Sequence, residues 1–178
     1  MSPGEKRAIG FPAPPTNGCR PWKRSVSSIM DTIDLPPDFK EFLKLLSDRR
    51  VEYLLIGGYA VAYHGYPRAT ADIDIWIAIH PHNAQKTVSV LKGFGFDLPQ
   101  VTVELFLKEK QIIRMGAPPV RIEIATSISG VDFPECWKER IVAVLDGVEV
   151  NIIDLKHLKI NKQAAGRHKD LDDLENLP

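Results

Sequence analysis

The sequence has few cysteines and lacks long apolar runs, and these absences exclude several classes of protein. Among 178 residues there are only two cysteines, Cys19 and Cys136. Two are too few for a disulfide scaffold, and neither lies in a spacing typical of zinc sites. We therefore expect unpaired thiols in a reducing compartment, the cytoplasm. No apolar run approaches the roughly 20 residues that span a bilayer, so we expect no membrane partner.

The chain also lacks net charge. Its 23 Lys and Arg residues balance 23 Asp and Glu residues. Without an overall field, the protein is not drawn to nucleic acid or an anionic membrane, and any site for a polyanion must be local. The length suits one domain with a proper core and is too short to predict two.

The beginning of the chain differs in composition from the rest. Residues 1–28 hold five prolines and three glycines without an apolar period, a composition typical of disorder. They contain no apolar segment of the kind that signal peptides require. We predict a disordered leader over 1–29 and a single domain over 30–178.

Hydrophobic periodicity predicts helices and strands in alternation along this domain. Helices are expected over 36–50, 59–65 and 82–93, and a further pair at the C-terminal end is separated by Gly166. Strands are expected over 51–57, 72–79 and 120–126, and a hairpin over 141–153. Residues 101–115 fit either a short helix or a strand. The predicted fold class is α/β (α+β), with a mixed, partly antiparallel sheet flanked by helices.

Two aspartates on the second predicted strand suggest a metal site. Because side chains alternate along a strand, Asp72 and Asp74 share one face, while Ile73 and Ile75 point into the core. Neighbouring carboxylates repel unless one becomes protonated or both find a cation. Magnesium binds one or two protein carboxylates together with substrate phosphate oxygens. A solvated acidic strand face is the alternative interpretation of these aspartates.

Two glycines between the first strand and the short helix suggest a phosphate site. Gly57 and Gly58 lack side chains, so a ligand can approach the backbone closely there. The free amides of a helix start favour an anion such as phosphate. A simple turn is the alternative for this pair of glycines.

Together these two features resemble the nucleotidyltransferase superfamily that includes DNA polymerase beta and the minimal nucleotidyltransferases. Residues 56–58 (Ile-Gly-Gly) and 72–74 (Asp-Ile-Asp) match its signature, with a gap of thirteen residues between Gly58 and Asp72. The longer segment is similar to toxin-type nucleotidyltransferases of abortive-infection and toxin–antitoxin systems. In these a His-Gly pair, an arginine and a threonine precede the aspartates, and His64, Arg68 and Thr70 occupy those places here.

The resemblance extends to the C-terminal part of the chain and implies a third acidic residue. Residues 158–177 resemble that group's final basic helix, which is followed by Lys-Asp and Asp. Glu123 is the best candidate for the third carboxylate, although many relatives have aspartate there. Glu104 and Asp132 compete with it, and Asp132 suits a helix cap better. Alternatively, Arg121 and Glu123 form a solvated pair on their strand.

The resemblance implies transfer of a nucleoside monophosphate from an NTP to an acceptor hydroxyl with release of pyrophosphate. Two Mg²⁺ ions, or Mn²⁺, would bind the catalytic carboxylates Asp72, Asp74 and Glu123. The implied nucleotide-binding residues are Gly57, Gly58, Arg68, Thr70, Lys162 and Lys169. A protein hydroxyl, a tRNA or a small molecule would accept the nucleotide, and a cognate antitoxin protein would be a partner. The alternative is a catalytically silent fold that senses nucleotides or binds a protein.

Further residues have two interpretations each. Lys156, Lys159 and Lys162 recur every third residue on one helix side, as on a solvated face or in a nucleotide or RNA cleft. Trp76 lies on the aspartate side of its strand, where it either stacks a base or packs structurally. For His64 we expect a packed, hydrogen-bonded role.

In the C-terminal helix, Asp170 and Asp173 share one face. Both are expected to pair with Arg167 or Lys169.

Overall fold

The computed structural model describes residues 33–117 and 120–178. The predicted leader and residues 30–32 of the predicted domain therefore lie outside the described residues. The strands are β1 Tyr53–Ile56, β2 Asp72–Ile77, β3 Ile112–Ala117, β4 Val120–Ala125, β5 Ile141–Leu145 and β6 Val148–Ile152. The helices are α2 Pro37–Asp48, α3 Gly57–Tyr63, α4 Pro81–Gly93, the 3-10 helix η1 Glu104–Leu107, α5 Phe133–Lys138, α6 Leu155–Ala165 and α7 His168–Asn176.

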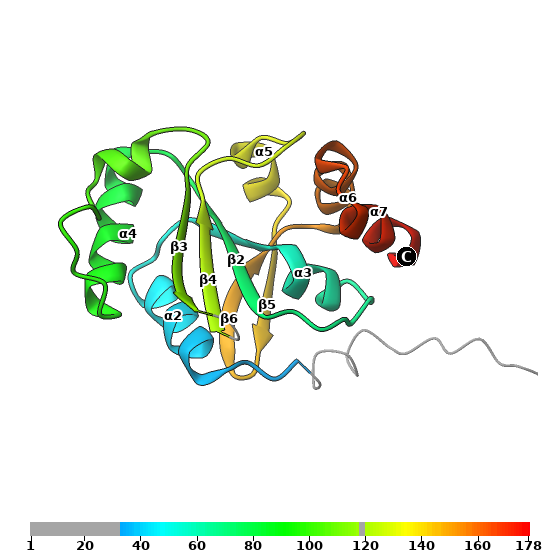
Figure 1. Ribbon diagram of the computed structural model, residues 1–178, viewed down its shortest axis with the longest axis horizontal. Helices are drawn as coiled ribbons and strands as arrows, with labels where there is room; N and C mark the ends of the chain where they lie inside the picture. Colours follow the sequence, from blue (N-terminus) through cyan, green and yellow to red (C-terminus); the bar gives the residue numbers. More distant parts are fainter. Residues whose placement is uncertain (1–32, 118–119) are drawn as a thin grey trace, which may run out of the picture.

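The six strands form one mixed sheet in the order β3-β4-β2-β1-β6-β5. β1 pairs antiparallel with β2 and parallel with β6, while β2 pairs parallel with β4. The hairpins β3–β4 and β5–β6 form the two edges. This arrangement confirms the predicted mixed, partly antiparallel sheet flanked by helices (Figure 1).

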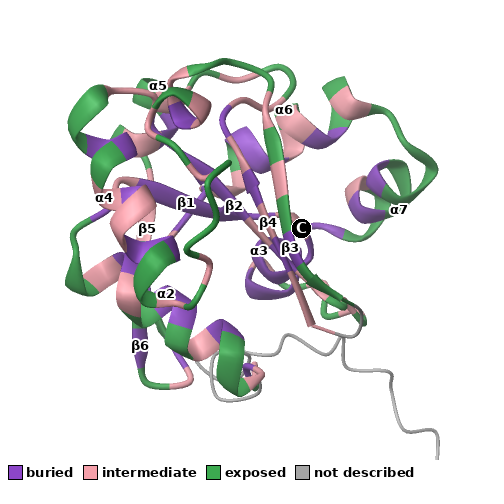
Figure 2. Ribbon diagram, turned by 60° about the vertical axis from the view of Figure 1, so that its left-hand side comes forward, coloured by how far each residue is buried: buried purple, intermediate pink, exposed green. Residues whose placement is uncertain are grey.

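Helix α2 forms where the sequence predicts it, because prolines precede an apolar row at helical spacing. Phe39, Phe42, Leu43 and Leu46 are fully buried on its inner side. The helix contacts β6, β4 and α4, so α2 and α4 lie together over the sheet (Figure 1). Figure 2 shows buried residues concentrated along β1 and β2 at the centre of the sheet. The core thus fixes the strand that carries the two aspartates.

Two predicted segments differ in their bounds from the structure. The short helix, expected over 59–65, spans 57–63, so the two glycines form its first turn instead of preceding it. The ambiguous segment 101–115 contains both alternatives, η1 followed by the start of β3. β3 is defined by its antiparallel pairing with β4, and sequence periodicity does not predict which strands pair.

The C-terminal helices follow the predicted division at Gly166. This residue ends α6 in the left-handed conformation, with φ 62°, which glycine adopts without strain. At the other end of α6 the Asp154 carboxylate accepts a hydrogen bond from the His157 amide. α6 packs against α7, and both lie to one side of the sheet (Figure 1). Within the described ranges, every helix is too short or too polar to cross a bilayer.

Candidate active site

The two aspartates of β2 share one face of the sheet, as the strand pattern predicts. Both are half-buried, whereas Ile73 and Ile75 are fully buried in the core on the other face. Parallel pairing with β4 places Glu123 directly beside Asp74. Three carboxylates from two adjacent strands therefore share this face of the sheet.

The two competing acids lie elsewhere. Glu104 is exposed on η1. Asp132 is exposed at the N-cap position of α5, as predicted, although its side chain makes no cap hydrogen bond. Glu123 is therefore the third acid that the fold places next to the aspartates, and its role remains a prediction.

Two arginines neutralise part of this acidic face. Arg121 lies beside Asp72 in the β2–β4 register. Its Nη2 donates to Asp72 Oδ2 at 2.7 Å and lies 3.1 Å from Glu123 Oε1. Arg114 of β3 donates from Nε to the same Glu123 oxygen at 3.0 Å. The alternative interpretation from the sequence, an Arg121–Glu123 pair, is therefore present, but it is connected to Asp72 as well.

The two glycines are required by close approaches within the site. Gly57 has φ +63°, and a Cβ there would lie 1.9 Å from Asp74 Oδ2. A Cβ on Gly58 would lie 2.7 Å from Thr70 Oγ1. Because these two residues have no side chain, the start of α3 packs closely against β2 and the loop that precedes it. The glycines and the aspartates are thus parts of one packed unit.

The surroundings of Asp74 disfavour its charged form. Burial raises the pKa of Asp74, and the negative charges of Glu123 and Asp72 raise it further. Lys162 and a hydrogen bond from the Gly58 amide act in the opposite direction without cancelling the rise. An additional cation at this place would favour the ionised carboxylate.

A cavity of about 590 Å³ opens over this face. The nine residues expected to be catalytic or nucleotide-binding all line it, namely Gly57, Gly58, Arg68, Thr70, Asp72, Asp74, Glu123, Lys162 and Lys169. The segment after β4 and the helices α6 and α7 supply other parts of the wall. Its volume lies within the range of about 300–1,000 Å³ that is usual for small-molecule sites.

A buried ion network connects α7 to the cavity. Lys162 Nζ lies 2.8 Å from Asp170 Oδ1 and 2.8 Å from Asp173 Oδ2. Arg68 binds Asp173 through two hydrogen bonds of 2.6 and 2.9 Å, and Arg167 donates to Asp170. The side chains of Lys162, Asp170 and Asp173 are 5%, 1% and 0% exposed. These pairs fix Lys162 and Arg68 at the cavity wall.

The network controls the protonation of its acids. Burial alone would raise the pKa of Asp170 and Asp173, but hydrogen bonds and charge from the cations outweigh it. The pKa values of both carboxyls are therefore lowered. The expected pairing with Arg167 is confirmed for Asp170, whereas Lys169 is exposed and forms no ion pair within the described part of the chain. For Asp173 the expectation is wrong, because its partners are Arg68 and Lys162.

The remaining candidates divide between structural and surface roles. Trp76 is 2% exposed and its Nε1 donates to the Thr126 carbonyl at 3.3 Å, so it packs structurally and is not accessible to a base. His64 bonds the Ile153 carbonyl at 2.8 Å, which confirms its packed role. Lys156 is exposed. The three lysines spaced three residues apart, Lys156, Lys159 and Lys162, therefore do not share one environment, because Lys162 is buried whereas Lys156 is exposed.

The donor set fits a divalent cation at the aspartates. Asp72 Oδ1 is buried and has no hydrogen-bond partner among the described residues. Such an atom is costly unless it meets a cation or a donor. As the side chains stand, no three Asp, Glu, His or Cys residues within 33–117 and 120–178 are grouped to hold a metal ion. Glu123 Oε1 is instead contacted by Arg114 and Arg121.

Several residues of the cavity are not marked by any sequence motif. Those not selected include Ile112, Arg114, Ala125, Ser127, Ile128, Ser129 and Asn161. Ser127 and Ser129 follow β4 in a loop that no motif marks, and Asn161 donates to the Ser129 carbonyl from α6 at 3.0 Å. Alternation along 120–126 does place Arg121 on the acidic face. Its contact with Asp72 required knowledge of which strand lies next to β4.

Comparisons with known proteins agree with this architecture. The model of a family described as "Nucleotidyltransferase of unknown function (DUF6036)" matches residues 37–177. Among solved structures, the chain resembles TM1012 from Thermotoga maritima, which is provisionally described as a nucleotidyltransferase, with a TM-score of 0.51. That similarity covers 82% of this chain and 95% of the other at 14% identity, and it supports the fold alone. The sequence matches no curated protein.

Proposed function

Since the chain belongs to the family of nucleotidyltransferases of unknown function, we propose that its acidic cavity moves a nucleoside monophosphate from an NTP to an acceptor hydroxyl. Pyrophosphate is the second product. The observation that carries this proposal is the meeting of Asp72, Asp74 and Glu123 with two side-chain-free backbone positions in one cavity. A phosphate chain needs both features, because its charge requires cations and its oxygens require close approach.

Two magnesium ions, or manganese, would be held by Asp72, Asp74 and Glu123, and would supply charge neutralisation and a lowered pKa for the attacking hydroxyl. The fit rests on the unpartnered Oδ1 of Asp72 and on the raised pKa of Asp74. Both features identify carboxylates that gain from an added cation.

The protein's own cations would bind the triphosphate. Lys162 and Arg68 line the cavity and are held in place by buried carboxylates of α7. A fixed cation stabilises developing negative charge without reorganising during the reaction. Lys169 lines the same cavity from an exposed position and would reach the nucleotide from the solvent side.

Backbone and hydroxyl groups would complete the nucleotide site. Gly57 and Gly58 offer bare backbone in the cavity, and Thr70 lies against Gly58. The Thr70 hydroxyl donates to the Asp72 carbonyl at 3.1 Å, which orders the loop that enters β2. Thr70 therefore positions the first aspartate and lines the nucleotide site at the same time.

We extend this proposal to a toxin-like role in a toxin–antitoxin or abortive-infection system. The support is the order of His64, Arg68 and Thr70 before the aspartates, together with the C-terminal basic helix and its acids. A protein hydroxyl or a tRNA would then be the acceptor, and a cognate antitoxin protein the partner.

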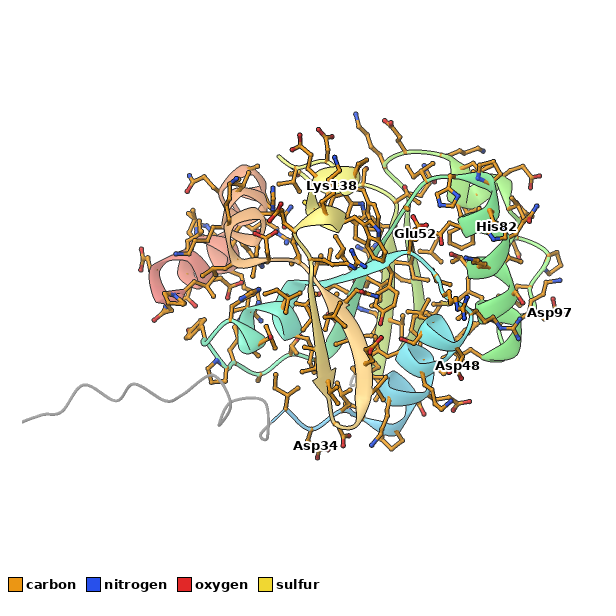
Figure 3. All side chains as sticks on the ribbon, turned by 180° about the vertical axis from the view of Figure 1, so that it is seen from behind. Asp34, Asp48, Glu52, His82, Asp97 and Lys138 are labelled. Carbon is orange, nitrogen blue, oxygen red and sulfur yellow. The ribbon has the colours of Figure 1, made fainter. Side chains whose placement is uncertain are left out.

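Labelled nucleotides test the reaction. The full chain is incubated with Mg²⁺, each NTP labelled at the α- or the γ-phosphate, and an acceptor panel of tRNA, cell protein and small hydroxyl compounds. Transfer of α-label without γ-label identifies nucleotidyl transfer, and transfer of γ-label alone identifies phosphoryl transfer and contradicts the proposal. The variant Asp72→Asn/Asp74→Asn should lose transfer, and Asp97→Asn should retain it. Asp97 is exposed near α4, on the far side from α6 and α7 (Figure 3).

A catalytically silent fold remains the second candidate, because Arg114 and Arg121 already occupy the acids. It predicts NTP binding without label transfer to any acceptor. It also predicts that binding persists after the metal is chelated. The same proteins in a calorimeter therefore separate the two functions.

A further inference from the structure

Arg121 occupies the position between two of the three acids of the site. Its Nη2 is 2.7 Å from Asp72 Oδ2 and 3.1 Å from Glu123 Oε1, so one nitrogen binds carboxylates from two strands. The β2–β4 register fixes this contact, since Arg121 lies beside Asp72 and Glu123 beside Asp74. A guanidinium therefore lies where carboxylates from both strands converge.

The arginines change the charge that an incoming cation meets. When ionised, the three carboxylates carry three negative charges, and the two arginines that contact them, Arg114 and Arg121, carry two positive charges. A divalent ion binds weakly where a guanidinium already holds the same oxygens, because the two cations repel and compete. Binding of a metal ion by Asp72 Oδ2 and Glu123 Oε1 therefore requires displacement of an arginine from those two oxygens.

Arg121 is better placed than Arg114 for such an exchange. Its side chain is 32% exposed, against 58% for Arg114, and it bridges two acids, whereas Arg114 contacts one. Its Nε is buried and has no hydrogen-bond partner among the described residues. The planar fork of a guanidinium matches phosphate oxygens in a bidentate geometry. Arg121 thus lines a cavity that would accommodate a phosphate chain, and its present contacts leave one donor of the guanidinium without a partner among the described residues.

We propose that Arg121 is an exchangeable counter-ion that holds Asp72 and Glu123 in the absence of metal and binds nucleotide phosphate once a divalent cation takes those acids. The inference rests on the proposed function and adds coupling between its two ligands. Metal binding releases the guanidinium, and the released guanidinium strengthens nucleotide binding. By linkage the nucleotide strengthens metal binding by the same factor.

Metal binding without nucleotide tests the first half of the exchange. Free Mn²⁺ is followed by electron paramagnetic resonance in titrations of the full chain, Arg121→Gln and the control Arg50→Gln. Arg50 is exposed and precedes β1, at the opposite end of that strand from Gly57. Arg121→Gln should bind Mn²⁺ about tenfold more tightly, because it removes a charge-assisted contact that competes with the metal. Arg50→Gln should match the unmodified chain.

Nucleotide binding at saturating Mn²⁺ tests the second half. A nonhydrolysable NTP should bind Arg121→Gln about tenfold more weakly than the unmodified chain, because one charged phosphate contact is lost. Arg121→Lys keeps the charge without the fork, so it should fall between the two. A melting curve for each variant shows that it is folded.

The outcomes separate the inference from its premise. Mn²⁺ affinity that is unchanged or weaker in folded Arg121→Gln overturns the exchange, as does unchanged nucleotide affinity. Absence of Mn²⁺ binding in all proteins instead overturns the metal site itself, and the exchange with it. Opposite changes in the two affinities, metal tighter and nucleotide weaker, support the exchange.

Discussion

Substitution of Lys162 by methionine tests how strongly the buried ion network holds α7 in place. The Nζ of Lys162 lies 2.8 Å from a carboxylate oxygen of both Asp170 and Asp173, and all three side chains are at most 5% exposed. Methionine keeps most of the apolar stem and removes the charge. Two buried carboxylates then lose a shared partner.

The magnitude follows from the partners that remain. Removing one member of a buried ion pair costs about 3–5 kcal/mol, since the other charge is left uncompensated. Asp173 keeps its two bonds from Arg68, and Asp170 keeps Arg167. The loss should therefore fall near the lower end, about 3 kcal/mol. At about 2–4 °C per kcal/mol for a domain of this size, the melting temperature should fall by about 6–12 °C.

Urea and thermal unfolding of the full chain measure this loss. Lys156→Met is the matched control, because it makes the same change on an exposed side of the same helix and should alter stability by no more than about 0.5 kcal/mol. Adding Asp170→Asn to Lys162→Met should recover about 1 kcal/mol by removing one of the stranded charges. A loss below about 1 kcal/mol for Lys162→Met, or one equal to the control, would refute the structural role assigned to the network.

Three further predictions concern the glycines and the carboxyls. Gly57→Ala should destabilise the protein by about 2–4 kcal/mol in urea unfolding, because its Cβ would meet Asp74 Oδ2 at 1.9 Å. Gly147→Ala shares the positive φ but faces open space, so it should cost only about 1 kcal/mol, and equal losses would contradict the steric argument. Asp74→Asn should stabilise the metal-free protein by about 0.5–1 kcal/mol at pH 7. Because the pKa of Asp74 is raised, its carboxyl contributes to stability at acid pH, and that contribution is lost as the pH rises through the pKa. The stability gained by Asp74→Asn at pH 7 should therefore vanish at acid pH. The pKa values of Asp170 and Asp173 are lowered, so these two carboxylates contribute to stability above about pH 4, and that stability should be lost as the pH falls further. A urea midpoint that stays constant below about pH 4 would contradict this prediction.

The sequence predicted well what depends on local periodicity. Alternation along β2 placed Asp72 and Asp74 on one face, and the apolar row of α2 gave its buried side. Gly166 marked the end of α6, where the chain needs a left-handed residue. In each case the determining interaction lies within a few residues of the pattern.

Predictions were incomplete where distant segments decide the environment. Lys162 belongs to a row of lysines that suggests solvent, but acids eight and eleven residues later fold back to bury it. Trp76 was correctly placed on the aspartate side, but whether it is accessible depends on Phe133, which packs against it edge-on at 5.0 Å. The sequence indicates Arg121 only as a partner of Glu123, because the parallel strand pairing that brings Arg121 beside Asp72 is not encoded locally.

Calorimetry with a nonhydrolysable NTP tests most directly the central claim that this cavity is a metal-dependent nucleotide site, because it requires no knowledge of the acceptor. The unmodified chain should bind one nucleotide with Mg²⁺ and lose that binding when the metal is chelated. Asp72→Asn/Asp74→Asn should show no such binding under either condition. Binding of equal strength after chelation, or in the double variant, would contradict the account, as would the absence of binding of any NTP to the unmodified chain.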